Sequence, residues 1–204
     1  MKTYGQICGI AQALDMIGDR WTLLILRELL LGPLRYGQLL QNLEGITTNL
    51  LADRLVHLSD SELVEKSGED RLSTYRLTER GNTIEPVLFA LGAWGWQFLD
   101  LKDKSKRRSL RWGLVSLKRR LKSSGRDYTI VFDTPDSGSF VAWEKDNVVG
   151  VGAMQAPGPD LVLHGPSLLL LKAVVERHPK PWDLKGIEVS GKRPLWTNFL
   201  TSSS

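Results

Sequence analysis

Small and polar side chains lie together on one side of residues 47–58, a stretch with the periodicity of a short helix. Amide, hydroxyl and methyl groups in such a row are the groups with which a helix reads base edges in the major groove of DNA. The opposite side carries leucines at i, i+4 and i+7, which predict a buried stripe. The candidate base-reading residues are Thr47, Thr48, Asn49, Ala52, Asp53 and Arg54.

The residues around this segment predict a helix-turn-helix. Residues 36–43 have the spacing of a shorter helix, and Gly45 ends it in a short turn. Thr47 suits the start of the next helix because its hydroxyl can accept a free backbone amide. Strand-like runs near 63–66 and 71–77 then predict a hairpin, which is the wing of a winged helix. Basic side chains of this region add three candidates for DNA contact: Arg35, Arg71 and Arg76.

Three more helices are expected in this half of the chain. The first is amphipathic and closes at Gly18, and Asp19 is expected to cap the second, Arg20 to Leu31, whose apolar faces indicate a core helix. A long apolar helix near Ile84 to Leu101 has more apolar surface than a small domain needs, which favours a dimer contact over packing within the monomer. The predicted dimer interface comprises Ile7, Ile10, Leu14, Leu88, Leu91, Trp94 and Phe98.

The pattern changes after a basic linker, residues 102–109. Residues 110–121 predict a basic amphipathic helix, either a surface helix whose leucines face its own domain, which we favour, or a contact for phosphates, anionic lipid or a partner. Five strand-like runs and a helix near 167–177 predict an α+β domain: a five-stranded antiparallel sheet with helices on one face. Its apolar residues form either a solid core or a ligand pocket. The candidate pocket residues are Phe140, Val141, Trp143, Val151, Met154, Leu163, Leu170 and Val174.

The charge is unevenly distributed along the chain. Residues 1–100 carry 13 acidic and 9 basic side chains, residues 101–125 carry 1 and 10, and residues 126–204 carry 9 and 8, for a net charge of +4. Any DNA-binding face in the first part must therefore be built from single arginines. A single cysteine, scattered histidines, no membrane-length apolar run and no signal-peptide core lead us to expect a cytoplasmic protein without metal, cofactor or membrane insertion.

The sequence offers little support for catalysis. No acid, base and nucleophile are gathered in one segment, so we expect no enzyme. A dinucleotide pattern that begins at Gly150 has Gln155 in place of its third glycine, and residues 186–192 match most of a phosphate loop but continue into Arg193 where that loop needs Ser or Thr. Cys8 is either a small buried residue without function or a thiol near a helix start that senses oxidants or electrophiles.

Residues 1–101 resemble the HxlR family of bacterial winged-helix regulators. The run Arg20-Trp21-Thr22 is specific to the resemblance. An ordered set of matches comprises Cys8, 13–29, 32–36, Leu39, 45–46, Leu51, 54–55, Leu58, 63–65, 75–78 and Gly81. The resemblance implies a homodimer on palindromic operator DNA, with terminal helices forming the dimer interface. It implies that residues 47–54 enter the major groove and that Arg71 lies in the wing. Some family members sense reactive species through the cysteine that matches Cys8.

Residues 107–204 resemble the sterol carrier protein type 2 family of lipid-binding domains. The matches are residues 144–150 between strands, 161–165 before a helix and 186–191 near the end, together with the order of the elements. The resemblance implies an apolar tunnel between a five-stranded sheet and its helices. It therefore adds an apolar or acyl small molecule to the expected partners.

Three functions remain open from the sequence. The first, which we favour, is a dimeric DNA-binding transcriptional regulator, expected to be a repressor, in which domain 1–101 binds DNA and domain 110–204 binds an apolar or acyl ligand that modulates it. The second is a lipid-binding carrier that uses the winged helix only for dimerisation, which the acidic balance of residues 1–100 supports. The third is a Cys8 thiol-switched regulator with a structural tail.

Overall fold

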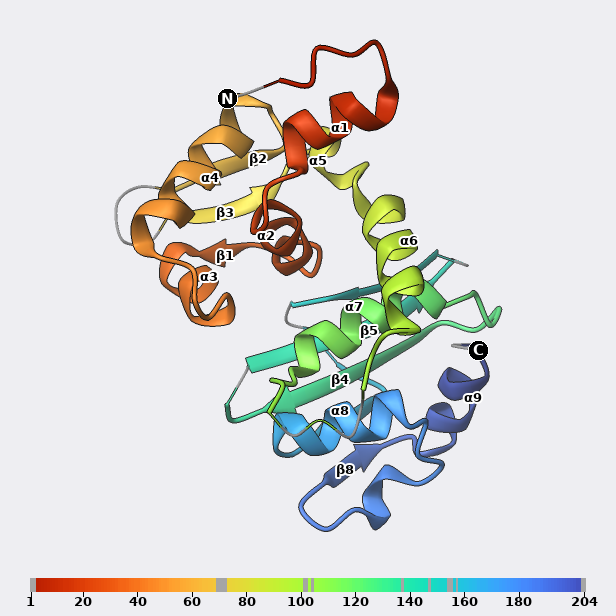
Figure 1. Ribbon diagram of the computed structural model, residues 1–204. Coiled ribbons are helices and arrows are strands. Elements are labelled where there is room, and N and C mark those ends of the chain that lie inside the picture. The colour runs from red at the N-terminus through yellow and green to blue at the C-terminus, as the bar shows by residue number, and fades with distance from the viewer. Residues whose placement is uncertain are drawn as a thin grey trace. The chain divides into compact units, whose positions relative to one another are not determined.

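A computed structural model (Figure 1) describes residues 3–68, 73–100, 103, 105–136, 138–146, 148–153, 156 and 158–202. The chain divides into two compact units, Met1–Leu91 and Gly92–Ser204. The division falls inside one helix, α6, which spans Glu85–Trp96. Among the described residues, no helix is both long and apolar enough to cross a membrane. The predicted domain limits at 101 and 110 stay a prediction.

The first unit is a winged helix-turn-helix, as the sequence predicts. The predicted helix-turn-helix is α3 followed by α4, and the predicted wing is the antiparallel hairpin of β2 and β3. A third short strand, β1, pairs with β3, so that the sheet order is β1-β3-β2. The bounds are α1 Gly9–Ile17, α2 Thr22–Leu29, β1 Leu34–Arg35, α3 Tyr36–Asn42, α4 Thr48–Asp60, β2 Val64–Ser67, β3 Thr74–Leu77 and α5 Glu79–Asn82.

The core of the first unit lies between α2, α3 and α4. The leucine stripe of α4 is buried, and so are Ile25, Leu26 and Leu29 of α2. Leu23 and Leu24, which the apolar pattern also assigns to this core helix, are only half-buried. The fully buried leucine and isoleucine side chains of these helices are Ile25, Leu26, Leu39, Leu51 and Leu58. The expected cap of α2 is wrong, because the helix begins at Thr22 after Trp21, without a side-chain cap. Asp19 uses its carboxylate in an ion pair with α4 instead.

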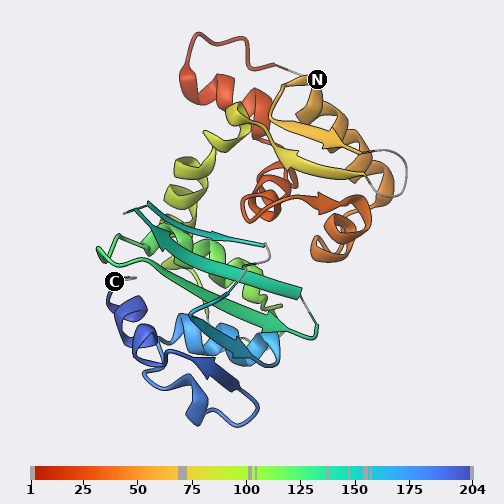
Figure 2. The ribbon, with the colours of Figure 1, turned by 180° about the vertical axis from the view of Figure 1, so that it is seen from behind.

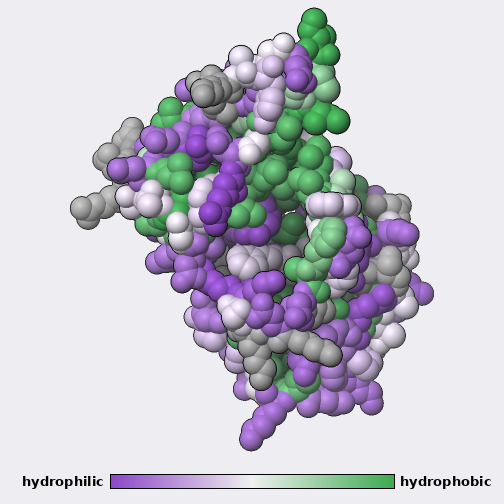
Figure 3. All heavy atoms as spheres, viewed as in Figure 1, coloured by the Kyte–Doolittle hydropathy of each residue, from purple (hydrophilic) through white to green (hydrophobic). Residues whose placement is uncertain are grey.

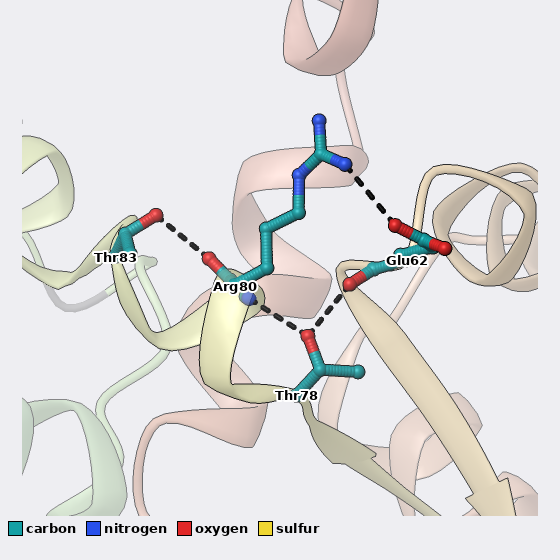
Figure 4. A network of polar contacts seen from close by, with 5 residues as sticks. Glu62, Thr78, Arg80 and Thr83 are labelled. Atoms are coloured by element: carbon teal, nitrogen blue, oxygen red, sulfur yellow. Dashed lines mark hydrogen bonds and ion pairs between the residues drawn. The ribbon is translucent and has the colours of Figure 1, made fainter.

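A polar network fixes the chain where it leaves the wing and enters α5 (Figure 4). The Thr78 hydroxyl accepts the Gly81 backbone amide at 2.9 Å and donates to the Glu62 carbonyl at 2.6 Å. Arg80 and Glu62 form an ion pair at 3.2 Å, and the Thr83 hydroxyl donates to the Arg80 carbonyl at 2.7 Å. These bonds satisfy groups at the helix start and tie it to the end of α4.

Helix α6 ends at Trp96, earlier than its apolar pattern predicts. Gly92 and Gly95 lie in its last turns and lower its helix propensity. Beyond the helix, the backbone amides of Phe98 and Leu99 donate to carbonyls three residues earlier, which is a tightened final turn.

The second unit is an α+β unit with one mixed five-stranded sheet. Its sheet order is β6-β5-β4-β7-β8. The predicted fully antiparallel sheet is wrong in one pair, because β7 runs parallel to β4. The chain leaves β6 at one edge and returns on the far side of β4, which is the crossover that parallel neighbours need. The bounds are α7 Leu110–Arg120, β4 Tyr128–Thr134, β5 Gly138–Lys145, β6 Val148–Gly152, β7 Leu161–His164, α8 Ser167–Val175, η2 Pro181–Asp183, β8 Glu188–Gly191 and α9 Pro194–Ser202.

Helices cover one face of this sheet. In Figure 1 α7 and α8 lie in front of the strands, and in Figure 2 the strands lie in front of these helices. The predicted inward leucines of α7 are all buried, as are Trp196 and Phe199 of α9. Phe132 of β4 lies 6.3 Å and 6.2 Å from these two rings, centroid to centroid. Aromatic packing of this kind fills the space between the sheet and α9.

The predicted pocket residues do not all lie on one face of the sheet. Within β5, Phe140 pairs across from Phe132 on the helix-covered face, and successive side chains of a strand alternate between faces. Val141 and Trp143 therefore lie on the opposite face, so their assignment to a pocket under the helices is wrong. The residues that share the covered face or its helices are Phe140, Val151, Leu163, Leu170 and Val174. Met154 lies outside the described residues.

Candidate nucleic-acid interface

The first half of α4 presents an exposed face of small and polar side chains. Thr47 caps the helix, because its hydroxyl oxygen accepts the Leu50 backbone amide at 3.3 Å. This confirms the cap expected from the sequence. The exposed side chains of this face are Thr47, Thr48, Asn49, Ala52 and Asp53. Hydroxyl, amide and carboxylate groups here are open to a base edge.

The turn before α4 sets where this face begins. Gly45 adopts φ +92° in the turn, a left-handed conformation that favours glycine. The Tyr36 hydroxyl at the start of α3 donates to the Thr48 carbonyl at 2.6 Å. Burial, and then the nearby Tyr75, raise the pKa of Tyr36, so its phenol keeps its proton at neutral pH. No local sequence pattern indicated this contact, since the partners lie far apart in the chain.

Two contacts fix α4 against the end of α1 and the segment that joins α1 to α2. Arg54 Nη1 lies 2.9 Å from Asp19 Oδ2, and both side chains keep only a quarter to a third of their surface exposed. One turn later, His57 Nε2 lies 2.9 Å from the Met16 carbonyl oxygen. Arg54 is therefore placed to orient α4 and is less available to DNA than the sequence suggests. Neither His57 nor Asp19 was assigned this role from the sequence.

The remaining basic candidates for DNA contact, Arg35, Arg71 and Arg76, lie outside α4. Arg35 is exposed at the end of β1, where its backbone amide donates to Gln38 Oε1 at 2.8 Å. Arg76 is exposed on β3 and forms an ion pair with Glu65 of β2 at 3.0 Å. This pair weakens the positive field that Arg76 can offer to a phosphate. Arg71 lies outside the described residues, so its place in the wing stays a prediction.

Large apolar side chains are exposed on α1 and α6 and beside them. Green atoms gather over these elements in Figure 3. Trp94 and Phe98 are each 64% exposed and contact each other edge to face at 5.0 Å. Of the predicted interface, Leu88 alone is half-buried, whereas the other six residues are exposed: Ile7, Ile10, Leu14, Leu91, Trp94 and Phe98. Ile7 precedes α1.

Cys8 is exposed at the N-terminal end of α1, where its thiol is open to reagents. The interpretation as a buried residue is therefore wrong. The backbone amides of Ala11 and Ile10 at the helix start lower the pKa of the thiol, which raises its thiolate fraction at neutral pH.

Sequence comparisons relate the part of the chain that holds α4 to helix-turn-helix transcriptional regulators. The family described as HxlR-like helix-turn-helix matches residues 16–103. The chain is 36% identical over 99 residues to the uncharacterized HTH-type transcriptional regulator sll1512 of Synechocystis, which covers 47% of this chain and 73% of that protein. It is 41% identical over 93 residues to regulator MT3179 of Mycobacterium tuberculosis, covering 44% of this chain but only 58% of that protein. The reduced form of the regulator YodB from B. subtilis is 30% identical, with a TM-score of 0.41, over 48% of this chain and all of that one.

Proposed function

Because the chain belongs to the HxlR-like helix-turn-helix family of transcriptional regulators, we propose that it is a homodimeric repressor that reads operator DNA with α4. The observation that carries the proposal is the exposed face of Thr48, Asn49, Ala52 and Asp53 on a helix that is capped and anchored at its start. An exposed polar face opposite a buried leucine stripe is the arrangement that a major-groove helix needs.

Each side chain of this face has a distinct task in the proposal. The Asn49 amide can donate to and accept from adenine, the Thr48 hydroxyl suits several bases, and the Ala52 methyl contacts a thymine methyl. The Asp53 carboxylate accepts from a cytosine amino group, and it disfavours phosphate, which directs this part of the helix toward the bases. Arg35 and the wing residues Arg71 and Arg76 contact phosphates, and a dimer brings a second α4 to the other half of a palindromic site.

The test needs an operator, which the full chain can select from a pool of random duplexes. Asn49→Ala is expected to weaken binding by roughly 1–3 kcal/mol and to relax specificity at one position. Val56→Ala is the matched control, since Val56 is 60% exposed on the same side of α4 but lies about 10 Å farther along the helix axis. If Asn49→Ala binds the operator as tightly and selectively as the wild type, α4 does not read bases.

The proposed dimer uses the exposed apolar side chains of α1 and α6. A single exposed apolar residue is ordinary, but several large ones on neighbouring turns mark an interaction surface. Ile10→Glu places a charge on α1, where Ile10 is 74% exposed, so it should leave the fold intact and split the dimer. Val148→Glu is the control, because Val148 is 59% exposed on β6. Sedimentation of the full chain as a monomer at all concentrations would contradict this proposal.

A thiol switch at Cys8 is a second candidate mechanism for the same regulator. It is supported by the exposed thiol at the start of α1, beside the proposed dimer contact. Oxidation or alkylation there would change the packing of α1 in the dimer. Cys8→Ser should bind operator DNA normally but lose its response to peroxide or quinone. An unchanged response in Cys8→Ser would exclude the switch.

Binding of an apolar or acyl ligand by the C-terminal unit, and its likeness to sterol carrier domains, stay predictions. The residues that could line such a site lie on the covered face of the sheet and on α8, among them Phe140, Leu163 and Leu170. A panel of fatty acids and acyl thioesters, tested for binding and for an effect on operator affinity, decides between a ligand site and a solid core. A change in operator affinity below about twofold would leave the unit without a regulatory ligand.

A further inference from the structure

The last turn of α7 in the second unit gathers positive charge around a half-buried arginine. Lys118, Arg119 and Arg120 follow one another at the end of this helix. The Arg120 side chain is half-buried, and its Nε is shielded from water without a hydrogen-bond partner in the described residues. A shielded guanidinium nitrogen that lacks a partner is costly, because it has lost water and gained nothing in return.

Other arginines add to this cost. Burial first, and then the positive charges of Arg119 and Arg177, lower the pKa of Arg120. Arg177 follows α8 in a left-handed conformation, φ +53°, which is uncommon for an arginine. Its Nη2 donates to the Leu200 carbonyl of α9. The three guanidinium groups therefore come from two segments, the end of α7 and the residues after α8. The Leu200 carbonyl keeps the Arg177 guanidinium in place despite their mutual repulsion.

No carboxylate among the described residues neutralises the two arginines in the last turn of α7, Arg119 and Arg120. Within the described part of the chain, neither Arg119 nor Arg120 forms an ion pair with a carboxylate. The carbonyl end of α7 offsets part of the repulsion, but the effect of a helix end on a nearby charge is small and is confined to its last turn. A bound anion would offset the rest and give the Arg120 Nε an acceptor.

We propose that Arg119, Arg120 and Arg177 bind the phosphate group of a small-molecule ligand between the ends of α7 and α8. Phosphate is favoured over a carboxylate because several planar guanidinium forks can share its tetrahedrally arranged oxygens. A small ligand is favoured over DNA because the half-buried Arg120 requires a group that enters between helices, whereas a duplex backbone contacts exposed side chains. This phosphate site lies in the second unit, whereas α4 lies in the first. The proposal therefore does not depend on whether α4 binds operator DNA.

The experiment is titration calorimetry of the full chain with inorganic phosphate, pyrophosphate and acetate at constant ionic strength. Arg119→Gln and Arg120→Gln each remove one guanidinium of the cluster. Arg126→Gln is the matched control, because it removes the same charge from an exposed position in the loop that follows α7. Arg119→Gln repeats the test without changing the half-buried Arg120, in case Arg120→Gln unfolds the protein.

The proposal expects saturable binding of phosphate or pyrophosphate, weakened about tenfold or more in each cluster variant. Arg126→Gln should change the affinity by less than about twofold, as expected for an exposed charge. Equal weakening in all three variants, absence of saturable binding, or acetate binding as tight as phosphate would each overturn it. So would a cluster variant that instead lowers operator affinity and its salt dependence, which would assign the cluster to DNA phosphates.

Discussion

Replacing Arg54 by glutamine separates two roles for this residue. The sequence places Arg54 with the DNA-contacting residues of α4, whereas the structure pairs its guanidinium with Asp19 at 2.9 Å. Glutamine keeps most of the side-chain length and removes the charge. We expect Arg54→Gln to lower the stability of the first unit and the precision with which α4 is oriented, with no loss of a phosphate contact.

The magnitude follows from the geometry of the ion pair. At 2.9 Å, Coulomb's law gives about 1.4 kcal/mol in water and about 6 kcal/mol at an effective dielectric of about 20. Water reaches both side chains, and desolvation and side-chain entropy oppose the attraction. We therefore expect a coupling free energy of about 1–2 kcal/mol, above that of a fully exposed pair and below that of a buried one.

The assay is a double-mutant cycle of Asp19→Asn and Arg54→Gln. Urea unfolding of the full chain measures the free energy of unfolding of each variant. The salt dependence of operator binding provides a second, independent readout. Arg54→Gln should leave its slope unchanged, whereas the control Arg35→Gln should lower the slope by about 0.9 for the loss of one phosphate contact.

Two results together would refute this reasoning. The first is a coupling free energy below about 0.3 kcal/mol, within the error of additivity. The second is a salt slope for Arg54→Gln that falls as much as that for Arg35→Gln. Arg54 would then leave Asp19 on binding and contact DNA, as the sequence alone suggests.

Three further predictions concern stability. Thr47→Ala should lower the free energy of unfolding by about 1 kcal/mol, the usual cost of a lost N-terminal cap, as measured by chemical unfolding. A loss below about 0.3 kcal/mol would mean that the Thr47 hydroxyl does not stabilise the start of α4. Gly81→Ala should lower the melting temperature strongly, because its Cβ would lie 1.9 Å from the Leu63 carbonyl oxygen, and a wild-type melting temperature would contradict that close approach. Burial alone would raise the pKa of Glu144, but hydrogen bonds from Ser123, Ser124 and Gly125 outweigh it and set the pKa at about 2. This depressed pKa contributes stability above about pH 4.5 that is lost as the pH falls toward 2, so Glu144→Gln should be destabilised by roughly 2–3 kcal/mol at neutral pH and show a weaker loss in acid.

Local patterns in the sequence determined the helices and their buried sides. The leucines of α4 and of α7 recur at helical spacing, and each predicted inward leucine of these helices is buried. The cap at Thr47 is equally local, since its acceptor and donor lie within one turn. The match to the HxlR-like family is also readable from sequence, because it rests on the order of residues along the chain. The helical spacing and the cap need only neighbours within one or two turns, and the family match needs only the order of residues along the chain.

Only the tertiary structure decided which distant groups meet. Asp19 could cap a helix or pair with Arg54, and the choice depends on how α4 packs against the segment before α2. The parallel pairing of β7 with β4 follows from where the chain crosses the sheet, which no strand pattern records. The separation of Val141 from Phe140 follows from the register of β5, because a shift of one residue exchanges the two faces. Contacts between segments far apart in the chain depend on packing and register, and these are properties of the folded chain.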